Sequence, residues 1–474
     1  MLERSRRRFL GAAMVGAGMV GAGNLLSSCG LKSVGERTTN KGKILLDGIQ
    51  NIPRGLRDAV NFPLIEAIHG RRSRRFARGA TIPRGPLAYS SELEPAPLSE
   101  LEQMLLLTTV SGNTGWTNLI PFNRFYLPRM PNYAGAAGGR TFPSSAGFHT
   151  SEIFFTDDNG SYFFPTRDMQ ATNTQNDEGE TDLNAYLNNH KSRIVKLGDE
   201  RLKLPAAPQH MEMHNEWCAN VPGSTLIIPV ADLAQHMILT LCYLVQNGAC
   251  LYDDVNQQSI PGINAFKSIV DVDNPYPLSV VEQIALTEVT VELSTSCYSG
   301  ALMLQAMGLG GWMYDGLNPH SVLGASGDAK VPGLGFRFDT DPRWPLPNVT
   351  GLDGVFEGHC PPHFSDMRAA VESVVTRKFG DNGPFNSRTP GPYKNNARVR
   401  GGAAPNDEFL VDCVTTMAQY IHNRFGRFPA TVPSIFVLMY LQAHQLDTGF
   451  YDKYFAPGAY LKTHANYAKN WNKK

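Results

Sequence analysis

Two aromatic segments around a short polar turn constrain the fold of this chain more than any other feature. Residues 152–155 and 161–164 are rich in phenylalanine and tyrosine, and they flank the run Asp-Asp-Asn-Gly at residues 157–160. Aromatic residues favour strands, and an Asn-Gly pair favours the backbone angles of a tight hairpin turn. The sequence therefore predicts an antiparallel β-hairpin, and with it an antiparallel sheet.

Hydrophobic periodicity predicts several further elements. Leucines at helical spacing and a serine near the cap, Ser99, indicate a helix over residues 98–110. A short buried strand is predicted over residues 225–229, whereas residues 279–293 are mixed in character. The other predicted helices cover residues 62–69, 231–246, 299–307, 409–425 and 433–446.

The first 29 residues form a leader that predicts export. Residues 5–10 read Ser-Arg-Arg-Arg-Phe-Leu, which matches a twin-arginine signal, and residues 26–29 read Leu-Ser-Ser-Cys, which is typical of a lipobox. We expect the twin-arginine translocase to export the folded chain. Its body then lies in the periplasm or on another extracytoplasmic face, anchored to a membrane by a lipid on Cys29. The alternative is an uncleaved N-terminal anchor, which also leaves the body outside the cytoplasm.

Charge and cysteine spacing exclude several classes of function. The chain carries 43 basic and 43 acidic residues, so its bulk charge gives no reason to expect a nucleic-acid partner. Apart from Cys29, no cysteines show the Cys-x-x-Cys spacing of a zinc ribbon or a redox pair. Cys242 and Cys297 lie in apolar runs and are predicted to be buried, and a disulfide stays open as an alternative. The remaining cysteines are Cys218, Cys250, Cys360 and Cys413.

Residues 71–75 read Arg-Arg-Ser-Arg-Arg, a concentration of side chains that bind phosphate. Guanidinium groups present fork-shaped donors that match phosphate oxygens, and a serine hydroxyl adds another donor. In an extended segment Arg71, Ser73 and Arg75 point to one side. The pattern suits a phosphate monoester such as that of FMN, and a solvated basic patch is the alternative.

Two further motifs could bring the backbone close to a flat ligand. Residues 143–147 read Pro-Ser-Ser-Ala-Gly just before the first hairpin strand, and residues 305–310 read Gln-Ala-Met-Gly-Leu-Gly at the end of an apolar helix. Small residues let backbone N–H groups approach a ligand. Taken singly, the first motif is also an ordinary turn and the second an ordinary helix end.

In this order, the three motifs resemble those of the nitroreductase family of flavoproteins, with the closest likeness to the azole-forming dehydrogenase branch. The resemblance covers roughly residues 62–335. It implies an α+β fold, with an antiparallel or mixed sheet flanked by helices, and a homodimer that binds FMN at its interface. Residues after 345, which have no counterpart in the resemblance, are expected to form an additional, mainly helical C-terminal region.

The resemblance also implies which residues bind the cofactor, although it identifies no catalytic residue. They are Arg71, Ser73 and Arg75 around the phosphate and ribityl chain, Ser144 and Ser145 near the isoalloxazine ring, and Gly308 and Gly310 on another side. The chain departs from the family pattern in two places. Ser145 stands where the family often has alanine, and residues 166–222 form a long insertion. The late basic residue that completes the phosphate site is unassigned, and its candidates are Arg337, Arg398 and Arg400.

The leading hypothesis is an exported FMN-dependent oxidoreductase that passes hydride or electrons through the flavin to a small-molecule substrate. The alternative is a non-redox binding or assembly lipoprotein that keeps the fold. The expected organisation is a signal peptide at residues 1–29, a tether at 30–61, a nitroreductase-like domain at 62–344 and a C-terminal extension at 345–474.

Three other patterns are weaker. His210 and His214 have the i, i+4 spacing of a helical metal site, but no third ligand is indicated for them. Cys360 and His363, next to His359, show a Cys-x-x-His spacing in a proline-rich turn. A serine hydrolase needs a Gly-x-Ser-x-Gly elbow, whereas residues 324–327 read Gly-Ala-Ser-Gly. We therefore expect neither a metal site nor a hydrolase.

Overall fold

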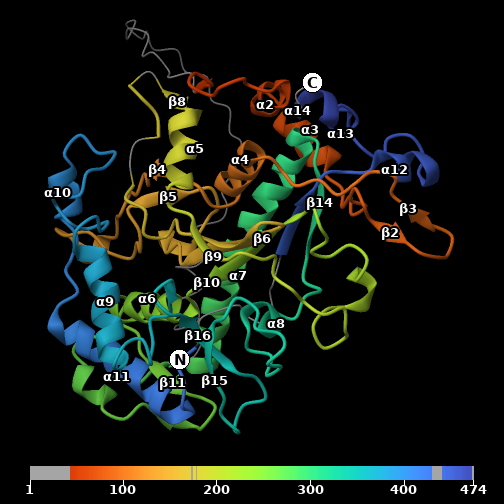
Figure 1. Cartoon of the computed structure of the whole chain (residues 1–474). Coiled ribbons are helices and arrows are strands. Elements are labelled where there is room, and N and C mark those ends of the chain that lie inside the picture. The colour runs from red at the N-terminus through yellow and green to blue at the C-terminus, as the bar shows by residue number, and fades with distance from the viewer. Residues whose placement is uncertain (1–42, 172–173, 178, 430–439, 472–474) are drawn as a thin grey trace, which may run out of the picture.

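The computed structural model describes residues 43–171, 174–177, 179–429 and 440–471. The leader and Cys29 lie outside these ranges, so export and lipidation stay predictions. In the described body, sheets are flanked by helices, and the region toward the C-terminus is mainly helical (Figure 1). The predicted α+β fold class is confirmed.

Six antiparallel strands form the central sheet, in the order β14-β18-β10-β6-β7-β9. Their bounds are β6 Ser151–Asp157, β7 Gly160–Phe164, β9 Val195–Gly198, β10 Thr225–Ala231, β14 Gly310–Tyr314 and β18 Tyr440–His444. β6 and β7 are the predicted aromatic hairpin, and the strand predicted over residues 225–229 is the first part of β10. Both predictions are confirmed.

Smaller sheets surround the central one. They pair β1 (Lys43–Leu45) with β8 (Glu180–Asp182), β2 (Thr81–Ile82) with β3 (Tyr89–Ser90), and β4 (Asn113–Trp116) with β5 (Gly138–Arg140). Two three-stranded sheets join β11 (Leu251–Asp253), β12 (Gln258–Ser259) and β13 (Tyr276–Pro277), and β15 (Arg337–Asp339), β16 (Asn348–Leu352) and β17 (Phe356–Glu357).

The helices in the described part of the chain range from single turns to one of 30 residues. The α-helices are α2 (Arg54–Val60), α3 (Leu64–Gly70), α4 (Glu100–Ser111), α5 (Leu183–Lys191), α6 (Leu233–Gln246), α7 (Leu278–Met307), α8 (Pro319–Leu323), α9 (Met367–Phe379), α10 (Asn396–Arg400), α11 (Glu408–Phe425), α12 (Thr448–Tyr454), α13 (Lys462–Ala465) and α14 (Tyr467–Trp471). The 3-10 turns are η1 (Arg124–Tyr126), η2 (Ser145–Gly147), η3 (Met213–Asn215) and η4 (Ile263–Phe266).

The central sheet is buried on both faces. Ile153 and Phe155 of β6 pack with Leu106 of α4 on one face, whereas Phe154 packs with Phe163 on the other. Successive side chains of a strand point to opposite faces. Alternate residues of the apolar run in β6 therefore belong to two different cores, one on each face of the sheet, and the hairpin is deeply buried.

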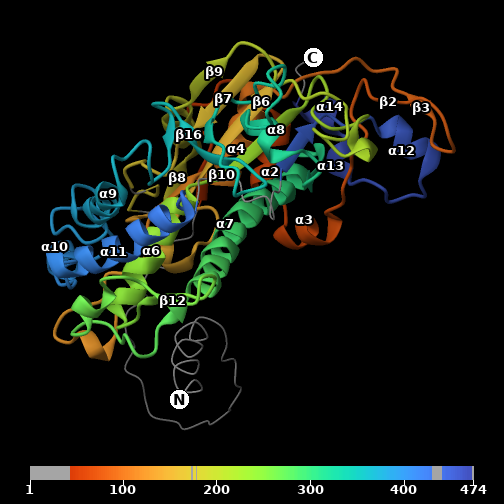
Figure 2. The same ribbon diagram turned by 90° about the horizontal axis from the view of Figure 1, so that it is seen from below.

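The long helix α7 crosses the body beneath the sheet and packs against α2, α3, α4 and α6 (Figure 2). The sequence predicts only its last part, residues 299–307. Its first turns belong to the same helix because Val281, Ala285 and Val289 are buried at a spacing of four residues. Polar residues between these positions hide the periodicity in the sequence.

The region after residue 345 shares the central sheet. α9 and α11 pack on α6 around one apolar core, and α11 confirms the helix predicted over residues 409–425.

Strand β18 of the same region lies between β14 and β10 in the central sheet. The helix predicted over residues 433–446 is therefore wrong for residues 440–444, and residues 430–439 lie outside the described ranges. All five side chains of β18 are buried, and so short a run, which reads Tyr-Leu-Gln-Ala-His, does not distinguish strand from helix. The domain boundary predicted near residue 345 thus separates strands of one sheet.

The tether predicted over residues 30–61 is wrong for its described part. β1 pairs in parallel with β8, and α2 packs against α7 and α14. Leu56 of α2 is fully buried, and a Cβ added at Gly55 would lie 2.3 Å from the indole of Trp471. Residues 43–61 therefore belong to the folded body.

Within the described ranges, no helix combines the length and the apolar character needed to cross a membrane. No disulfide joins any two of the six cysteines in these ranges, and all six are buried. The predicted burial of Cys242 and Cys297 is confirmed.

We predict that Leu56→Ala lowers the free energy of unfolding by about 2–5 kcal/mol, because the truncation leaves a cavity in the core. Val255→Ala in the turn between β11 and β12 is the control. Val255 is 63% exposed, so its truncation should change the free energy by less than about 0.5 kcal/mol. Urea unfolding followed by circular dichroism measures both, and equal effects would contradict the placement of residues 43–61 in the core.

Candidate functional site

The arginine-rich segment at residues 71–75 is fastened to the edge of the central sheet by Arg74. Its backbone N–H donates to Gly311 O (3.1 Å) and its carbonyl accepts from Gly311 N (2.8 Å). The buried guanidinium donates to Gln305 Oε1 (2.5 Å), Ala459 O (3.0 Å) and Gly70 O (3.1 Å). Burial lowers the pKa of Arg74 to about 10. Arg74 is therefore a structural anchor.

The residues on either side of Arg74 face outward, as the alternation predicts. Ser73 is exposed, and Arg71 and Arg75 are half-buried. The Arg75 guanidinium lies 5.5 Å from the centre of the Trp217 ring and donates a long hydrogen bond of 3.4 Å to Asn215. This side of the segment offers two cations and a hydroxyl with donor capacity to spare.

The two glycines of the third motif lie beside this anchor, at the end of α7. Gly308 has a φ of 76°, and a Cβ there would lie 2.3 Å from Thr463 O. A Cβ at Gly310 would lie 2.6 Å from His444 Nε2. Both glycines are buried. Their small size thus allows close approach of the chain's own C-terminal segment, and they do not line an open surface.

The second motif lies elsewhere within the chain. Ser144 Oγ donates to Glu292 of α7 and accepts from His149 N (2.9 Å), and Ser145 begins the turn η2. Glu292 precedes Gly308 by sixteen residues, which is about 24 Å along a helix. The structure therefore brings the first and third motifs together and leaves Ser144 and Ser145 far from both.

Next to this turn, the structure shows a buried cluster of charged residues that sequence reasoning misses. Arg140 lies 3.8 Å from Glu152, Arg167 lies 3.1 Å from Asp232, and His359 Nδ1 lies 2.5 Å from the same carboxylate. Burial raises the pKa of Glu152, although Arg140 and Arg167 oppose the shift. The residues that contact each other in this cluster are separated by up to 127 positions. The one local signal in the sequence is Asp232 before an apolar helix, and it indicates only a helix cap.

The charged cluster borders a cavity of about 260 Å³, whose wall includes Arg140, Arg167, Arg377, Asp168 and His149. Asp168 pairs with both Arg167 (3.7 Å) and Arg377. Burial lowers the pKa of His149 to about 3, so its ring is neutral at physiological pH. Carboxylates balance the positive charges of the arginines here, so we interpret the cluster as a structural network.

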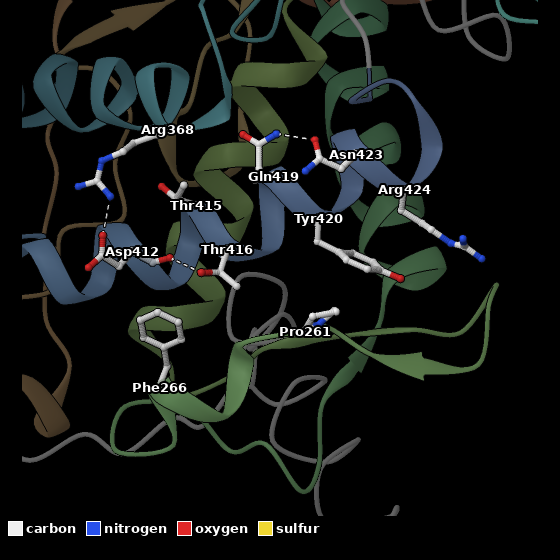
Figure 3. Close-up of a pocket in the computed structure, with 10 residues that line it drawn as sticks. All are labelled: Pro261, Phe266, Arg368, Asp412, Thr415, Thr416, Gln419, Tyr420, Asn423 and Arg424. Carbon is white, nitrogen blue, oxygen red and sulfur yellow. Dashed lines mark hydrogen bonds and ion pairs between the residues drawn. The ribbon is translucent and has the colours of Figure 1, made fainter.

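A larger, more open cavity of about 750 Å³ lies over α11 and η4 (Figure 3). Two cations line it. Arg368 contacts three carboxylates, those of Asp412, Glu372 and Glu408, and Arg424 donates to Asn256 (2.6 Å). None of the predicted cofactor residues lines this cavity. It therefore offers no support for a flavin site.

The histidine patterns are engaged in other contacts. His210 Nδ1 lies 2.8 Å from Ser321 Oγ, and His214 lies 3.3 Å from Glu212 on the surface. His359 pairs with Asp232. Across the described ranges, no group of three or more His, Cys, Asp or Glu side chains could hold a metal ion. Arg337, a candidate for the late basic residue, pairs with Asp353 and Glu357.

No protein-family model and no curated protein matches this chain. Among solved structures, a protein from Ralstonia eutropha JMP134 that is provisionally named a nitroreductase shares 14% sequence identity with a TM-score of 0.25. The match covers 54% of this chain and 71% of that one. Similarity of this size carries no functional argument.

We predict that Asp232→Asn destabilises the protein in a pH-dependent way. Burial alone would raise the pKa of Asp232, but His359 and Arg167 outweigh it and lower the pKa to about 2. The carboxylate thus contributes stability on the order of 2 kcal/mol that is present above pH about 4 and lost as the pH falls toward 2. Urea unfolding at pH 7 and at pH 3 should show a gap between wild type and variant that narrows at the lower pH. A gap of constant size would contradict the ionic role.

Proposed function

We propose that this chain is an exported, lipid-anchored homodimer that binds FMN and acts as a nitroreductase-type oxidoreductase on a small molecule. The observation that carries the proposal is the arrangement around Arg74. That residue points inward and holds the segment against the end of α7, while Ser73 is exposed and Arg71 and Arg75 are half-buried.

The outer side chains fit a phosphate monoester. Two guanidiniums and a hydroxyl supply several N–H and O–H donors, and charge-assisted bonds to phosphate are among the stronger hydrogen bonds in proteins. Arg75 makes one long hydrogen bond within the described chain and so keeps most of its donors for a ligand. The neighbouring Arg72 donates to the backbone carbonyls of His69 and Arg71, so the two outer arginines are the better phosphate ligands.

A single chain does not bring the ring-binding turn to this phosphate site, so the proposal requires two chains. The outer face of α7 carries a stripe with alternating spacings of four and three residues: Val280, Ile284, Thr287, Val291, Ser294 and Tyr298. Val280, Val291 and Tyr298 are 40–43% exposed. Stripes of this spacing pack helices against each other. The adjacent α3 adds exposed Leu64 and Ile65 to the same region.

Two-fold symmetry would complete the site from this face. If two α7 helices pack antiparallel about an axis near residue 300, position 292 of one helix lies opposite position 308 of the other. The part of the stripe around Val291, Ser294 and Tyr298 then faces the partner's α7, whereas Val280 and Ile284 extend past the end of that helix. The turn containing Ser144 of the partner subunit would then approach the end of α7 beside Arg71 and Ser73. Each flavin would receive its phosphate ligands from one chain and its ring contacts from the other.

A bound flavin supplies reversible hydride acceptance. Arg71, Ser73 and Arg75 of this chain would hold its phosphate, and Ser144 and Ser145 would position its ring. His444 lies under Gly310, and burial lowers its pKa to about 4, so the imidazole is neutral there. The catalytic proton donor and the electron donor stay unassigned.

One observation favours the alternative of a non-redox binding or assembly lipoprotein. Gly308 and Gly310 are covered by Thr463 and His444 of the same chain, so they offer no open surface to a ring. The two proposals differ in flavin content, which is directly measurable.

We predict that purified protein contains FMN and that Arg71→Ala/Arg75→Ala lowers flavin retention by at least about tenfold, because both outer cations of the phosphate site are lost. Arg72→Ala is the matched control within the same segment and should keep the flavin. The absorbance of flavin released on denaturation measures retention. A colourless wild type that takes up no added FMN would favour the non-redox alternative, and retention by the double variant would move the phosphate site elsewhere.

We also predict that Val291→Glu on α7 shifts the protein from dimer to monomer and lowers its flavin content, because the charge would be buried at the helix interface. Val195→Glu on β9 is the control, since Val195 and Val291 are 42% and 43% exposed. Light scattering after size-exclusion chromatography gives the mass. A Val291→Glu variant that stays dimeric would exclude this face as the interface.

A further inference from the structure

The loop between β4 and β5 exposes an unusual number of large apolar side chains. Within residues 118–130, which we call the apolar loop, Ile120 is 86%, Phe122 70%, Phe125 80% and Leu127 64% exposed. Large apolar side chains gathered on one exposed segment mark a binding surface rather than ordinary surface. In Figure 2 the orange turn η1 of this loop lies at the lower edge of the body.

Hydrogen bonds to other elements hold the backbone of the apolar loop in place, so the exposed apolar side chains extend from a fixed backbone. Tyr126 Oη donates to Gln246 O at the end of α6 (2.6 Å). Tyr393 Oη donates to Leu119 O. Met130 exchanges hydrogen bonds with Gly402 (3.0 Å) and Ala404 (2.8 Å). The four apolar side chains lie between these anchors and point away from them into solvent.

The charges around the apolar loop are mainly positive. Residues 103–151 contain no aspartate or glutamate, and Arg124 and Arg129 are exposed within the loop. Exposed Lys394 and Arg398 lie on the segment that clamps it. Acidic residues lie at the margin of this surface. Exposed Asp407 and Glu408 follow Asn406, whose side chain accepts from Asn132 (2.7 Å), and Asp271 and Asp273 lie on the loop that Asp271 N ties to Gly248 O (2.8 Å). The loop and the segment that clamps it are thus apolar and cationic, with carboxylates farther out.

We propose that the apolar loop inserts into the interfacial layer of a lipid bilayer and sets the orientation of the protein on the membrane. Apolar and aromatic side chains next to arginines are the composition that lies at a lipid interface, where rings sit among headgroups and cations contact lipid phosphates. Unlike a protein partner, a lipid surface can take up apolar side chains that point in different directions, because it needs no pocket of matching shape. The arginines match the charge of anionic headgroups.

The apolar loop would complement the proposed anchor on Cys29. The 14 Cα–Cα steps from Cys29 to Lys43 span at most about 50 Å, so a lipid at that position leaves the orientation of the body open. The inference rests on the proposed membrane location and is independent of the flavin.

Vesicle flotation of lipid-free protein tests the inference. A chain starting at residue 30 keeps every described residue and removes the acylation site from the measurement. We expect it to bind vesicles of phosphatidylcholine with phosphatidylglycerol, and to bind pure phosphatidylcholine more weakly. Phe122→Ser/Phe125→Ser should lower the partition coefficient by at least about tenfold. Leu87→Ser/Leu93→Ser, at two apolar sites that are each 44% exposed on a distant hairpin, is the matched control and should bind like the parent.

Three outcomes would overturn the inference: a parent that does not float with vesicles, equal losses in both double variants, or a change of oligomeric state in Phe122→Ser/Phe125→Ser without loss of vesicle binding. The last would assign the loop to a protein partner. Phe122→Trp gives a second readout, because its fluorescence should shift to the blue when anionic vesicles are added. Flavin content of the same variants separates this result from the proposed function, since it should not change.

Discussion

Burial of the Arg74 guanidinium at the end of α7 is the interaction on which the rest of this architecture depends. A buried cation is tolerated only where its donors find acceptors. Here the acceptors come from Gly70, Gln305 and Ala459, three parts of the chain that are far apart in sequence. One side chain thus joins the N-terminal segment, the long helix and the C-terminal segment. The same contact fixes which neighbours of Arg74 face outward, so the proposed phosphate site follows from a structural requirement.

Local structure could be predicted from the sequence wherever neighbouring residues determine it. The hairpin β6–β7 follows from aromatic strands around an Asn-Gly turn, and α4 follows from the capping box of Ser99 and Glu102. β18 could not be predicted, because its strand character comes from lying between β14 and β10, partners far away in the chain. The sequence also did not predict α2, for a related reason. Its short polar sequence gives little signal, and only its packing on α7 and α14 makes Leu56 a core residue.

The candidate site likewise has features that the local sequence predicts and features that only the folded chain determines. Alternation along residues 71–75 predicts that Arg71, Ser73 and Arg75 point to one side. Their burial fits this pattern, since Arg74 is buried while Ser73 is exposed and Arg71 and Arg75 are half-buried, but exposed Arg72 departs from it. The distance between Ser144 and Gly308 depends on where the turn sits along α7, and no local pattern encodes it. Nor does any pattern connect Asp232 with His359, which meet only when β10 and the segment after β17 converge. The glycines of the third motif show most clearly what a local pattern leaves undetermined. Gly308 and Gly310 leave room for Thr463 and His444 of the same chain, and the motif alone does not tell this role from close approach to a ligand.

The turn around Ser144 gives an independent reason to treat the second motif as more than a connection. Ala146 and His149 have positive φ angles of 48° and 50°, a conformation that costs residues with a Cβ on the order of 1 kcal/mol or more each. Glu292 holds the turn in this shape by accepting hydrogen bonds from Ser144, from Thr150 N (3.0 Å) and from Ser151 Oγ (2.6 Å). A plain connection between two strands needs neither the strained residues nor a buried carboxylate. The helix α7 therefore fixes two motifs at points about 24 Å apart. In the proposed dimer, this rigid element would hold the two halves of the proposed site at a set distance.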